Sequence, residues 1–327
     1  ALVGQSLADC LDLPDVSFDL DLTPNRGDCF SVLGIARDLS AMTSTAMKDP
    51  SVAPVTATLD DDHPVELGYP AGCPRFGARI VRHIDMSAES PIWMKERLRR
   101  SGLRSIHPVV DVTNYVMMEL GQPLHAYDLA RLNGPIVPRL AESGEKLTLL
   151  DESDVELLPN TLVISDDSGA IGMAGIMGGL STAVTSDTKD VFFEAAFFTP
   201  EMMAGVARQY GMHTDASMRF ERGVDPVNQV RAIERATELL IEIAGGEAGP
   251  VVDHHVDQYL PESRSLELRK SRLSRILGAE IPGERVTQIL SGLGLKTEPN
   301  EDGWSVNIPS FRFDIDVEDA LVEEVAR

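Results

Sequence analysis

The sequence predicts an α+β fold of more than one domain, in which mixed sheets pack against helices. The chain has 327 residues, more than the roughly 100–200 of one domain, and 43% of them are hydrophobic, enough for a substantial core. Apolar residues recur every three or four positions in segments 112–120 and 227–244, as on one face of a helix. Short apolar or alternating runs between residues 75 and 198 indicate strands.

The first 72 residues predict a small structured unit and a linker. Residues 17–22 alternate between apolar and acidic side chains, which indicates a half-exposed strand. The segment TPNRGDC then turns, and residues 30–42 are expected to form a helix capped by Asp28. Residues 44–63 are rich in Asp, Thr, Ser and Pro, which is typical of a linker.

Strand and helix signals alternate between residues 75 and 174. Residues 75–86 alternate as a strand, and Ser90 and Pro91 begin a helix that ends at Gly102. Residues 147–158 and 162–174 indicate two hairpins. The most basic patch of the chain fits a solvated helix face and an RNA contact equally well. It consists of Lys95, Arg97, Arg99, Arg100 and Arg104.

Residues 108–128, PVVDVTNYVMMELGQPLHAYD, combine a helix with the turn behind it. Asp111 is expected to cap this helix, which places Thr113 and Asn114 in its first turn, where backbone N–H groups are unpaired. Gly121 stops the helix, and His125 then lies on a rigid turn after Pro123. These side chains could form a pocket that binds and polarises a small polar group. A buried, hydrogen-bonded core histidine is the alternative.

Glu194 is the single acid in the apolar strand expected at residues 191–198. A carboxylate in a core needs a hydrogen-bond partner, whereas on an edge strand the same residue would face water. The preceding run GAIGMAGIMGG fits neither G-x-G-x-x-G nor a P-loop with its Lys, so no ATP site is assigned to it. Its glycines at 175, 178 and 179 let the backbone approach a ligand or a neighbouring strand.

The last third of the chain predicts helices and a second, smaller module. Residues 200–211 are expected to form one helix, and residues 227–246 a long amphipathic helix. From Arg264 the pattern changes to two helices separated at Pro282, followed by a strand, a turn and the start of a helix.

Several of these segments resemble one family, the bacterial phenylalanyl-tRNA synthetase beta subunit, in the family's own order along the whole chain. Residues 108–128 resemble its VDVTNYV…E.GQPLHAFD block, in the B3/B4 module that hydrolyses mischarged tRNA. Residues 21–41 are similar to a segment of its B1 domain. TDASMRFERGVDP is similar to TDASHRFERGVDP, with Met218 in place of the usual His. The end of the chain resembles FDI..EEDL.EE of the B5 domain, with Ala320 where an Asp is expected.

This resemblance implies three groups of site residues. The catalytic group is His125, Thr113 and Asn114. Glu194 matches the residue that recognises the phenol hydroxyl of tyrosine, and further substrate-pocket positions are Ala174, Gly175, Thr214 and Ala216. Asp314, Glu323 and Glu324 match acids of a magnesium site that the family shares with its alpha subunit, a match that Ala320 weakens.

The resemblance also implies how the chain is divided. Residues 1–46 would be the C-terminal part of a B1 domain, and residues 47–72 a linker. Residues 73–252 would form the B3/B4 editing domain, and residues 253–327 a truncated, helix-rich, winged-helix-like B5 domain. The chain lacks an initial Met and stops in what reads as an unfinished helix, so we expect an excised segment.

The implied function is hydrolysis of mischarged Tyr-tRNA(Phe) in support of Phe-tRNA(Phe) synthesis by phenylalanine–tRNA ligase. The alternative is a non-catalytic scaffold that binds the alpha subunit and positions tRNA. The synthetic site, and with it ATP, is expected on the alpha subunit of an α2β2 heterotetramer. No Ser-His-Asp order, H-E-x-x-H or Cys nucleophile has supporting spacing, so hydrolysis by a positioned water is the chemistry that remains.

Composition limits the partners and the compartment. The net charge of −23 opposes binding of RNA by bulk electrostatics, so tRNA would need local basic patches or other parts of the protein, and DNA is not expected. No run approaches the roughly 18–20 apolar residues needed to cross a bilayer, and the first residues, ALVGQSLADC, lack the charged region and apolar core of a signal peptide. Three cysteines without C-x-x-C spacing favour a reducing compartment, the cytoplasm, in a soluble protein.

Overall fold

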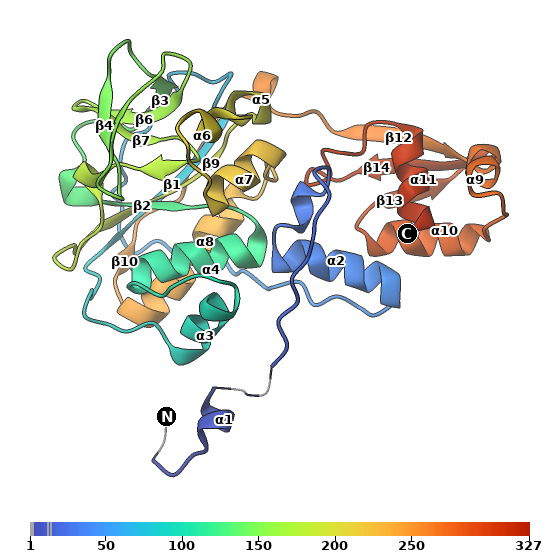
Figure 1. The fold of residues 1–327 in the computed structure, drawn as a ribbon, viewed down its shortest axis with the longest axis horizontal. Helices are drawn as coiled ribbons and strands as arrows, with labels where there is room; N and C mark the ends of the chain where they lie inside the picture. The colour runs from blue at the N-terminus through green and yellow to red at the C-terminus, as the bar shows by residue number, and fades with distance from the viewer. Residues whose placement is uncertain (1–2, 12, 14) are drawn as a thin grey trace.

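The computed structural model describes residues 3–11, 13 and 15–327. These residues form a large α+β unit and a small C-terminal unit, with helix α2 (Val32–Thr43) between them (Figure 1). A short helix, α1 (Leu7–Cys10), lies at the end of an extended N-terminal segment. The predicted α+β class is confirmed. No helix in the described ranges is long and apolar enough to cross a membrane.

The large unit is built on a five-stranded antiparallel sheet. Its strand order is β10 (Glu247–Ala248), β1 (Arg75–Arg82), β9 (Val191–Phe197) and β2 (His125–Asp128), and β11 (Val252–His255) also pairs with β1. Every residue of β9 is buried. The predicted apolar strand is therefore confirmed as a central strand covered on both faces.

Different layers cover the two faces of this sheet (Figure 1). Helices α4 (Pro108–Leu120) and α8 (Gln229–Ala244) bury one face together with Val191 and Phe193 of β9. A second antiparallel sheet buries the other face together with Phe192 and Ala196. Its strands run in the order β3 (Val137–Leu140), β6 (Leu162–Asp166), β7 (Gly169–Met173) and β8 (Met177–Gly178).

Most predicted elements of the large unit are present. The two hairpins are confirmed as β4 (Lys146–Thr148) with β5 (Asp154–Glu156), and β6 with β7. Helix α3 (Ile92–Arg100) follows Pro91 as expected. The single helix predicted at 200–211 is wrong, because Gly205 adopts a positive φ and divides it into α5 (Pro200–Met203) and α6 (Val206–Gln209).

Helix α4 begins four residues earlier than the sequence predicts. Its N-cap is His107, whose ring accepts a hydrogen bond from the Val110 N–H, and Pro108 occupies the first turn. The prediction that Asp111 caps the helix is wrong, because its buried carboxylate instead accepts hydrogen bonds from Ser90 and Ser105. The predicted end is confirmed, since Gly121 adopts the left-handed conformation with φ 78°.

Two predictions for the first 44 residues need correction. Residues 17–22 form no strand and are largely exposed. Helix α2 is capped by Ser31, whose hydroxyl accepts a hydrogen bond from the Gly34 N–H, and not by Asp28. Asp28 lies one turn earlier, in the 3₁₀ helix Gly27–Cys29.

The C-terminal unit has a core of its own around a three-stranded antiparallel sheet. The strand order is β12 (Arg264–Arg269), β14 (Gly303–Ile308) and β13 (Lys296–Pro299), and the helices are α9 (Lys270–Leu277), α10 (Gly283–Gly292) and α11 (Glu318–Ala326). The predicted helices and β14 are confirmed, but the sequence analysis missed β12 and β13.

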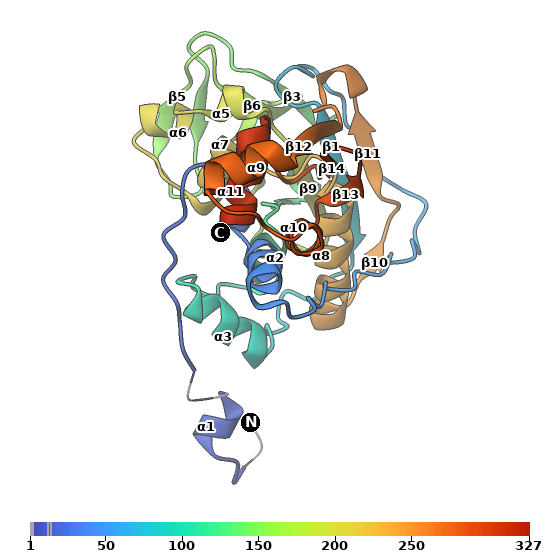
Figure 2. The same cartoon turned by 90° about the vertical axis from the view of Figure 1, so that its right-hand side faces the viewer.

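Helix α2 packs against α10 of the C-terminal unit (Figure 2) and also against α4. The Arg37 guanidinium lies 3.7 Å from the centroid of the Phe311 ring. At the crossing with α10, a Cβ added to Gly292 would lie 3.0 Å from the Cα of Ala41, so the backbones approach closely. Residues from the two ends of the chain thus share one contact surface.

Candidate functional site

A pocket opens between β2, β9, the glycine-rich segment 172–178 and helix α7 (Asp215–Arg222). Five of the predicted site residues line it: His125, Ala174, Gly175, Glu194 and Ala216. Its other walls are mostly apolar and include Ile164, Ile176 and Phe220. Such a cavity, apolar with a few polar groups, is typical of a small-ligand site.

The pairing of β2 with β9 brings the polar residues of this pocket together. His125 pairs directly with Glu194 in the antiparallel register, and Tyr127 pairs with Phe192. Because side chains alternate along a strand, His125 and Tyr127 point to the same face of the sheet as Glu194. A pattern of period two in HAYD and FFEA therefore produces a cluster of three polar side chains.

Glu194 is buried, with 6% of its surface exposed. The Tyr127 hydroxyl donates a hydrogen bond of 2.6 Å to its Oε2 atom. Burial raises the pKa of Glu194 to about 7, and the hydrogen bond from Tyr127 offsets only part of this rise. The expectation that a buried Glu194 needs a partner is confirmed, and the edge-strand alternative is wrong.

His125 begins strand β2 and does not lie on a turn, as the sequence analysis expected. Its Nε2 atom is buried and has no hydrogen-bond partner among the described residues. Its ring stands edge-on to the Tyr127 ring, with centroids 4.5 Å apart. Burial lowers the pKa of His125 to about 4, so the imidazole is neutral at neutral pH.

Two glycines make room for this arrangement. A Cβ added to Gly178 would lie 2.4 Å from Cε1 and 2.6 Å from Nε2 of His125, so no larger residue fits beside the ring. Gly175 has a φ of 64°, and a Cβ there would meet the Phe220 ring at 2.7 Å. The interpretation of this run as a place of close backbone approach is confirmed.

Three of the predicted catalytic and substrate-binding residues do not line the pocket. Thr113 and Asn114 lie in the middle of α4, where the Thr113 hydroxyl donates to the carbonyl of Val110. The open helix start expected to hold them is therefore absent at this position. Thr214 stands behind the wall: it caps α7, and its hydroxyl donates to the carbonyl of Ile176.

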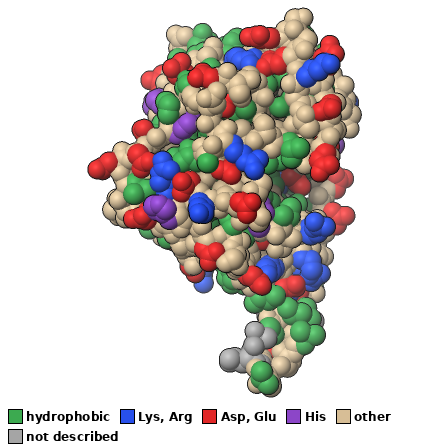
Figure 3. Space-filling view, turned by 90° about the vertical axis from the view of Figure 1, so that its left-hand side faces the viewer, with side chains coloured by type: hydrophobic (Ala, Val, Ile, Leu, Met, Phe, Trp, Pro, Cys, Tyr) green, Lys and Arg blue, Asp and Glu red, His purple; other side chains and the backbone are tan. Residues whose placement is uncertain are grey.

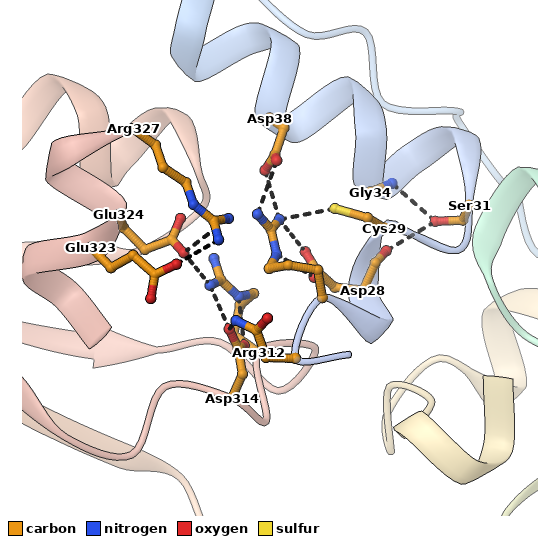
Figure 4. Close-up of polar contacts among 12 residues, drawn as sticks. Asp28, Cys29, Ser31, Gly34, Asp38, Arg312, Asp314, Glu323, Glu324 and Arg327 are labelled. Atoms are coloured by element: carbon orange, nitrogen blue, oxygen red, sulfur yellow. Dashed lines mark hydrogen bonds and ion pairs between the residues drawn. The ribbon is translucent and has the colours of Figure 1, made fainter. Parts of the chain in front are cut away.

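The predicted magnesium ligands already form ion pairs with two arginines (Figure 4). The Arg312 guanidinium, 1% exposed, forms ion pairs with Asp314 at 2.8 Å and with Glu324 at 2.7 Å. Glu323 pairs with Arg327 at the surface. In the described ranges no cluster of three or more His, Cys, Asp or Glu side chains could hold a metal ion. As arranged here, these residues do not fit a divalent cation.

Sequence reasoning missed Tyr127 and Arg312. The alternation in HAYD was a usable signal for Tyr127, because it places this residue on the same side of the strand as His125. Arg312 had no comparable signal, since its contact with Glu324 in α11 depends on how the loop after β14 folds back.

Two domain families and several known proteins match this chain. The B3/4 domain family matches residues 72–245, and the tRNA synthetase B5 domain family matches residues 266–327. Over its whole length the chain is 50% identical to the phenylalanine–tRNA ligase beta subunits of Pectobacterium atrosepticum and Vibrio vulnificus, and 52% identical to that of Pseudomonas syringae. It spans 41% of the length of each of these relatives.

The solved structures that match include an N-terminal fragment of the phenylalanyl-tRNA synthetase beta subunit from Pyrococcus horikoshii. The TM-score is 0.44 and the sequence identity is 16%, over 93% of this chain and 84% of that one.

The raised pKa of Glu194 predicts a pH-dependent effect of Glu194→Gln on stability. From about pH 4.5 upward the unfolded chain ionises Glu194, while the folded chain keeps its proton up to about pH 7, so the free energy of unfolding falls across this window. Gln cannot ionise and can still accept the Tyr127 hydrogen bond. Urea unfolding should show the variant matching the wild type near pH 4 and exceeding it by roughly 3 kcal/mol near pH 8.

Glu119→Gln is the matched control for this experiment. Glu119 also accepts a tyrosine hydroxyl, that of Tyr115, but it pairs with Arg235 outside the pocket. This control should lose stability near pH 8, because Arg235 loses a charged partner. A difference between Glu194→Gln and wild type that does not vary with pH would show that Glu194 is ionised in the folded chain.

Arg312→Met should destabilise the C-terminal unit by about 3–5 kcal/mol, because the buried carboxylates of Asp314 and Glu324 lose their nearest charged partner. Arg327→Met, which breaks a half-exposed pair with Glu323 and a longer contact of 3.9 Å with Glu324, should cost at most about 1 kcal/mol. Thermal unfolding measures both variants. Millimolar Mg²⁺ should leave the Tm of the wild type unchanged. A Tm that rises with Mg²⁺ would show that the acids exchange Arg312 for the cation.

Proposed function

Because the chain belongs to the B3/4 domain family and matches phenylalanine–tRNA ligase beta subunits along its whole length, we propose that it edits mischarged Tyr-tRNA(Phe). In this proposal the pocket beside β2 and β9 holds the tyrosyl group and its ester, and hydrolysis releases tyrosine. The observation that carries the proposal is a buried carboxyl group, Glu194, paired across the sheet with a neutral histidine in one cavity.

Glu194 supplies the selectivity. Tyr127 is its only hydrogen-bond donor among the described residues, so Oε1 is left for the phenol hydroxyl of a bound tyrosine. A phenylalanine side chain in the same position would leave that buried oxygen unpaired. A site built to bond a hydroxyl rejects an analogue without it by roughly 10⁴–10⁵. Tyrosine and phenylalanine differ by this hydroxyl alone.

His125 acts at the other end of the substrate. With a pKa lowered to about 4, its ring is too weak a base to remove a proton efficiently, but its free Nε2 can orient a water or the ester by a hydrogen bond. The water oxygen adds to the ester carbonyl carbon and gives up a proton, the bond to the terminal ribose oxygen breaks, and that oxygen takes up the proton lost by the water. The ester is already activated, so orientation is the main requirement.

The complete enzyme would provide the remaining parts. In this proposal the alpha subunit of an α2β2 assembly synthesises Phe-tRNA(Phe) with ATP. The enzyme would act in the cytoplasm, where it meets tRNA. Acidic and basic side chains are interspersed over the face of the large unit in Figure 3. With a net charge of −23, this chain would not attract tRNA by bulk electrostatics, so other parts of the enzyme would hold the tRNA body.

Substituting Glu194 and His125 tests this function in the complete beta subunit assembled with its alpha subunit. Glu194→Ala should slow hydrolysis of Tyr-tRNA(Phe) by roughly 10- to 150-fold, the cost of about 1.5–3 kcal/mol for a lost hydrogen bond to a charged group. His125→Ala should lower the same rate without changing the preference for tyrosine, because it acts on the ester and not on the side chain. Initial rates of deacylation measure both effects.

Charging of tRNA with phenylalanine should be normal in both variants, since the synthetic site is elsewhere. Glu119→Ala, which changes an acid outside the pocket, serves as the control and should edit at the wild-type rate. Normal deacylation by both pocket variants would contradict the editing function. The chain would then be a scaffold that binds the alpha subunit and positions tRNA.

A further inference from the structure

We propose that Tyr127 is a specificity-determining residue of this pocket, because its hydroxyl occupies one oxygen of Glu194 and leaves the other as the acceptor for a ligand hydroxyl. This inference rests on the proposed editing function. It assigns Tyr127 a positioning role, since the residue acts through Glu194 and not on the reacting ester.

The surroundings of Tyr127 hold its hydroxyl in place. The residue is 1% exposed and lies on β2, two positions after His125. Its ring packs edge-on to the His125 ring on one side and against the Phe192 ring, 6.0 Å away between centroids, on the other. Because the ring cannot turn away, the 2.6 Å hydrogen bond to Oε2 fixes the orientation of the Glu194 carboxyl group.

A fixed carboxyl group presents Oε1 in one direction only. Ala78, the residue of β1 that pairs with Glu194, has no polar side chain that could bond this oxygen. Glu194 lines the pocket, so a ligand bound there can donate a hydrogen bond to this carboxyl group. A ligand whose hydroxyl arrives along this direction completes the hydrogen bonding of Glu194, and a ligand without a hydroxyl does not.

Tyr127 also favours the charged form of Glu194. Its hydrogen bond counters the rise in the pKa of Glu194 that burial causes, and the value stays at about 7. Leaving an ionised carboxylate unpaired costs more than leaving a neutral one unpaired. Discrimination against phenylalanine should therefore be greatest above pH 7, where Glu194 is ionised. By lowering the pKa of Glu194, Tyr127 should keep part of this discrimination at neutral pH.

The other titratable groups around this pair come from three further segments. His125 lies beside Tyr127 on β2, and Cys73 lies before β1. The charge of Asp166, on β6, contributes to the raised pKa of Tyr127. The ring of His63 lies 5.3 Å from that of Phe192. Burial raises the pKa values of Cys73 and Tyr127 and lowers those of His125 and His63. Burial raises the pKa of Glu194 itself to about 7, within the pH range of the test below.

The test measures how the preference for tyrosine depends on pH in the assembled enzyme. Initial rates of hydrolysis of Tyr-tRNA(Phe) and Phe-tRNA(Phe) give a ratio at each pH. In the wild type this ratio should rise with pH around 7. Tyr127→Phe should lower the ratio about tenfold at neutral pH, the effect of one hydrogen bond to a charged group, and should move the midpoint to higher pH.

Tyr115→Phe is the matched control. It removes a tyrosine hydroxyl that also donates to a glutamate, Glu119, but outside the pocket. Its ratio and midpoint should equal those of the wild type. A 3-fluorotyrosine at position 127 keeps the ring and makes the hydroxyl a stronger donor, so it should move the midpoint to lower pH even if Tyr127→Phe fails to fold.

The outcomes separate this inference from the proposed function. If the wild type hydrolyses Tyr-tRNA(Phe) selectively but neither change at position 127 shifts the midpoint, the role of Tyr127 is overturned and editing stands. If the wild type does not hydrolyse Tyr-tRNA(Phe) above background, the proposed function fails and the inference fails with it. Opposite shifts of the midpoint in the two variants, with an unchanged Tyr115→Phe, support the inference.

Discussion

Strand β9 is buried on both faces, and its antiparallel pairing with β2 places His125 opposite Glu194. The rest of the pocket depends on this register, because a shift of one residue would move Glu194 into the helical layer against α4 and α8. The same burial that makes β9 a stable centre for two cores raises the pKa of its only acid. Both the packing of the two cores and the raised pKa of Glu194 therefore depend on strand β9.

The parts of the fold that could be predicted are those with local causes. The hairpin at 162–174, the apolar strand at 191–198 and the end of α4 at Gly121 each follow from a few adjacent residues. The errors have non-local causes. Asp111 looked like a helix cap, but its carboxylate accepts hydrogen bonds from Ser90 and Ser105, which lie outside the helix. Strand β12 was missed because its pairing partner, β14, lies more than thirty residues further on.

The site was predictable residue by residue but not as an arrangement. Glu194 and His125 stood out by their chemistry and by resemblance, yet only the strand register shows that they face each other. Thr113 and Asn114 were placed at an open helix start, and the earlier start of α4 moves them more than a turn into the helix. For the expected metal ligands, attention to the acids alone overlooked Arg312, which neutralises two of them.

The contact of α2 with α10 has a consequence for the order in which the protein can be completed. Gln288 of α10 donates a hydrogen bond to Ser44 at the end of α2, and these residues are separated by 244 positions in the chain. At about 5–20 residues per second, a ribosome needs roughly 12–50 s to make the intervening chain. During this time α2 can pack against α4 while its other side has no partner. The C-terminal unit must therefore dock onto a surface of α2 that formed before this unit was synthesised.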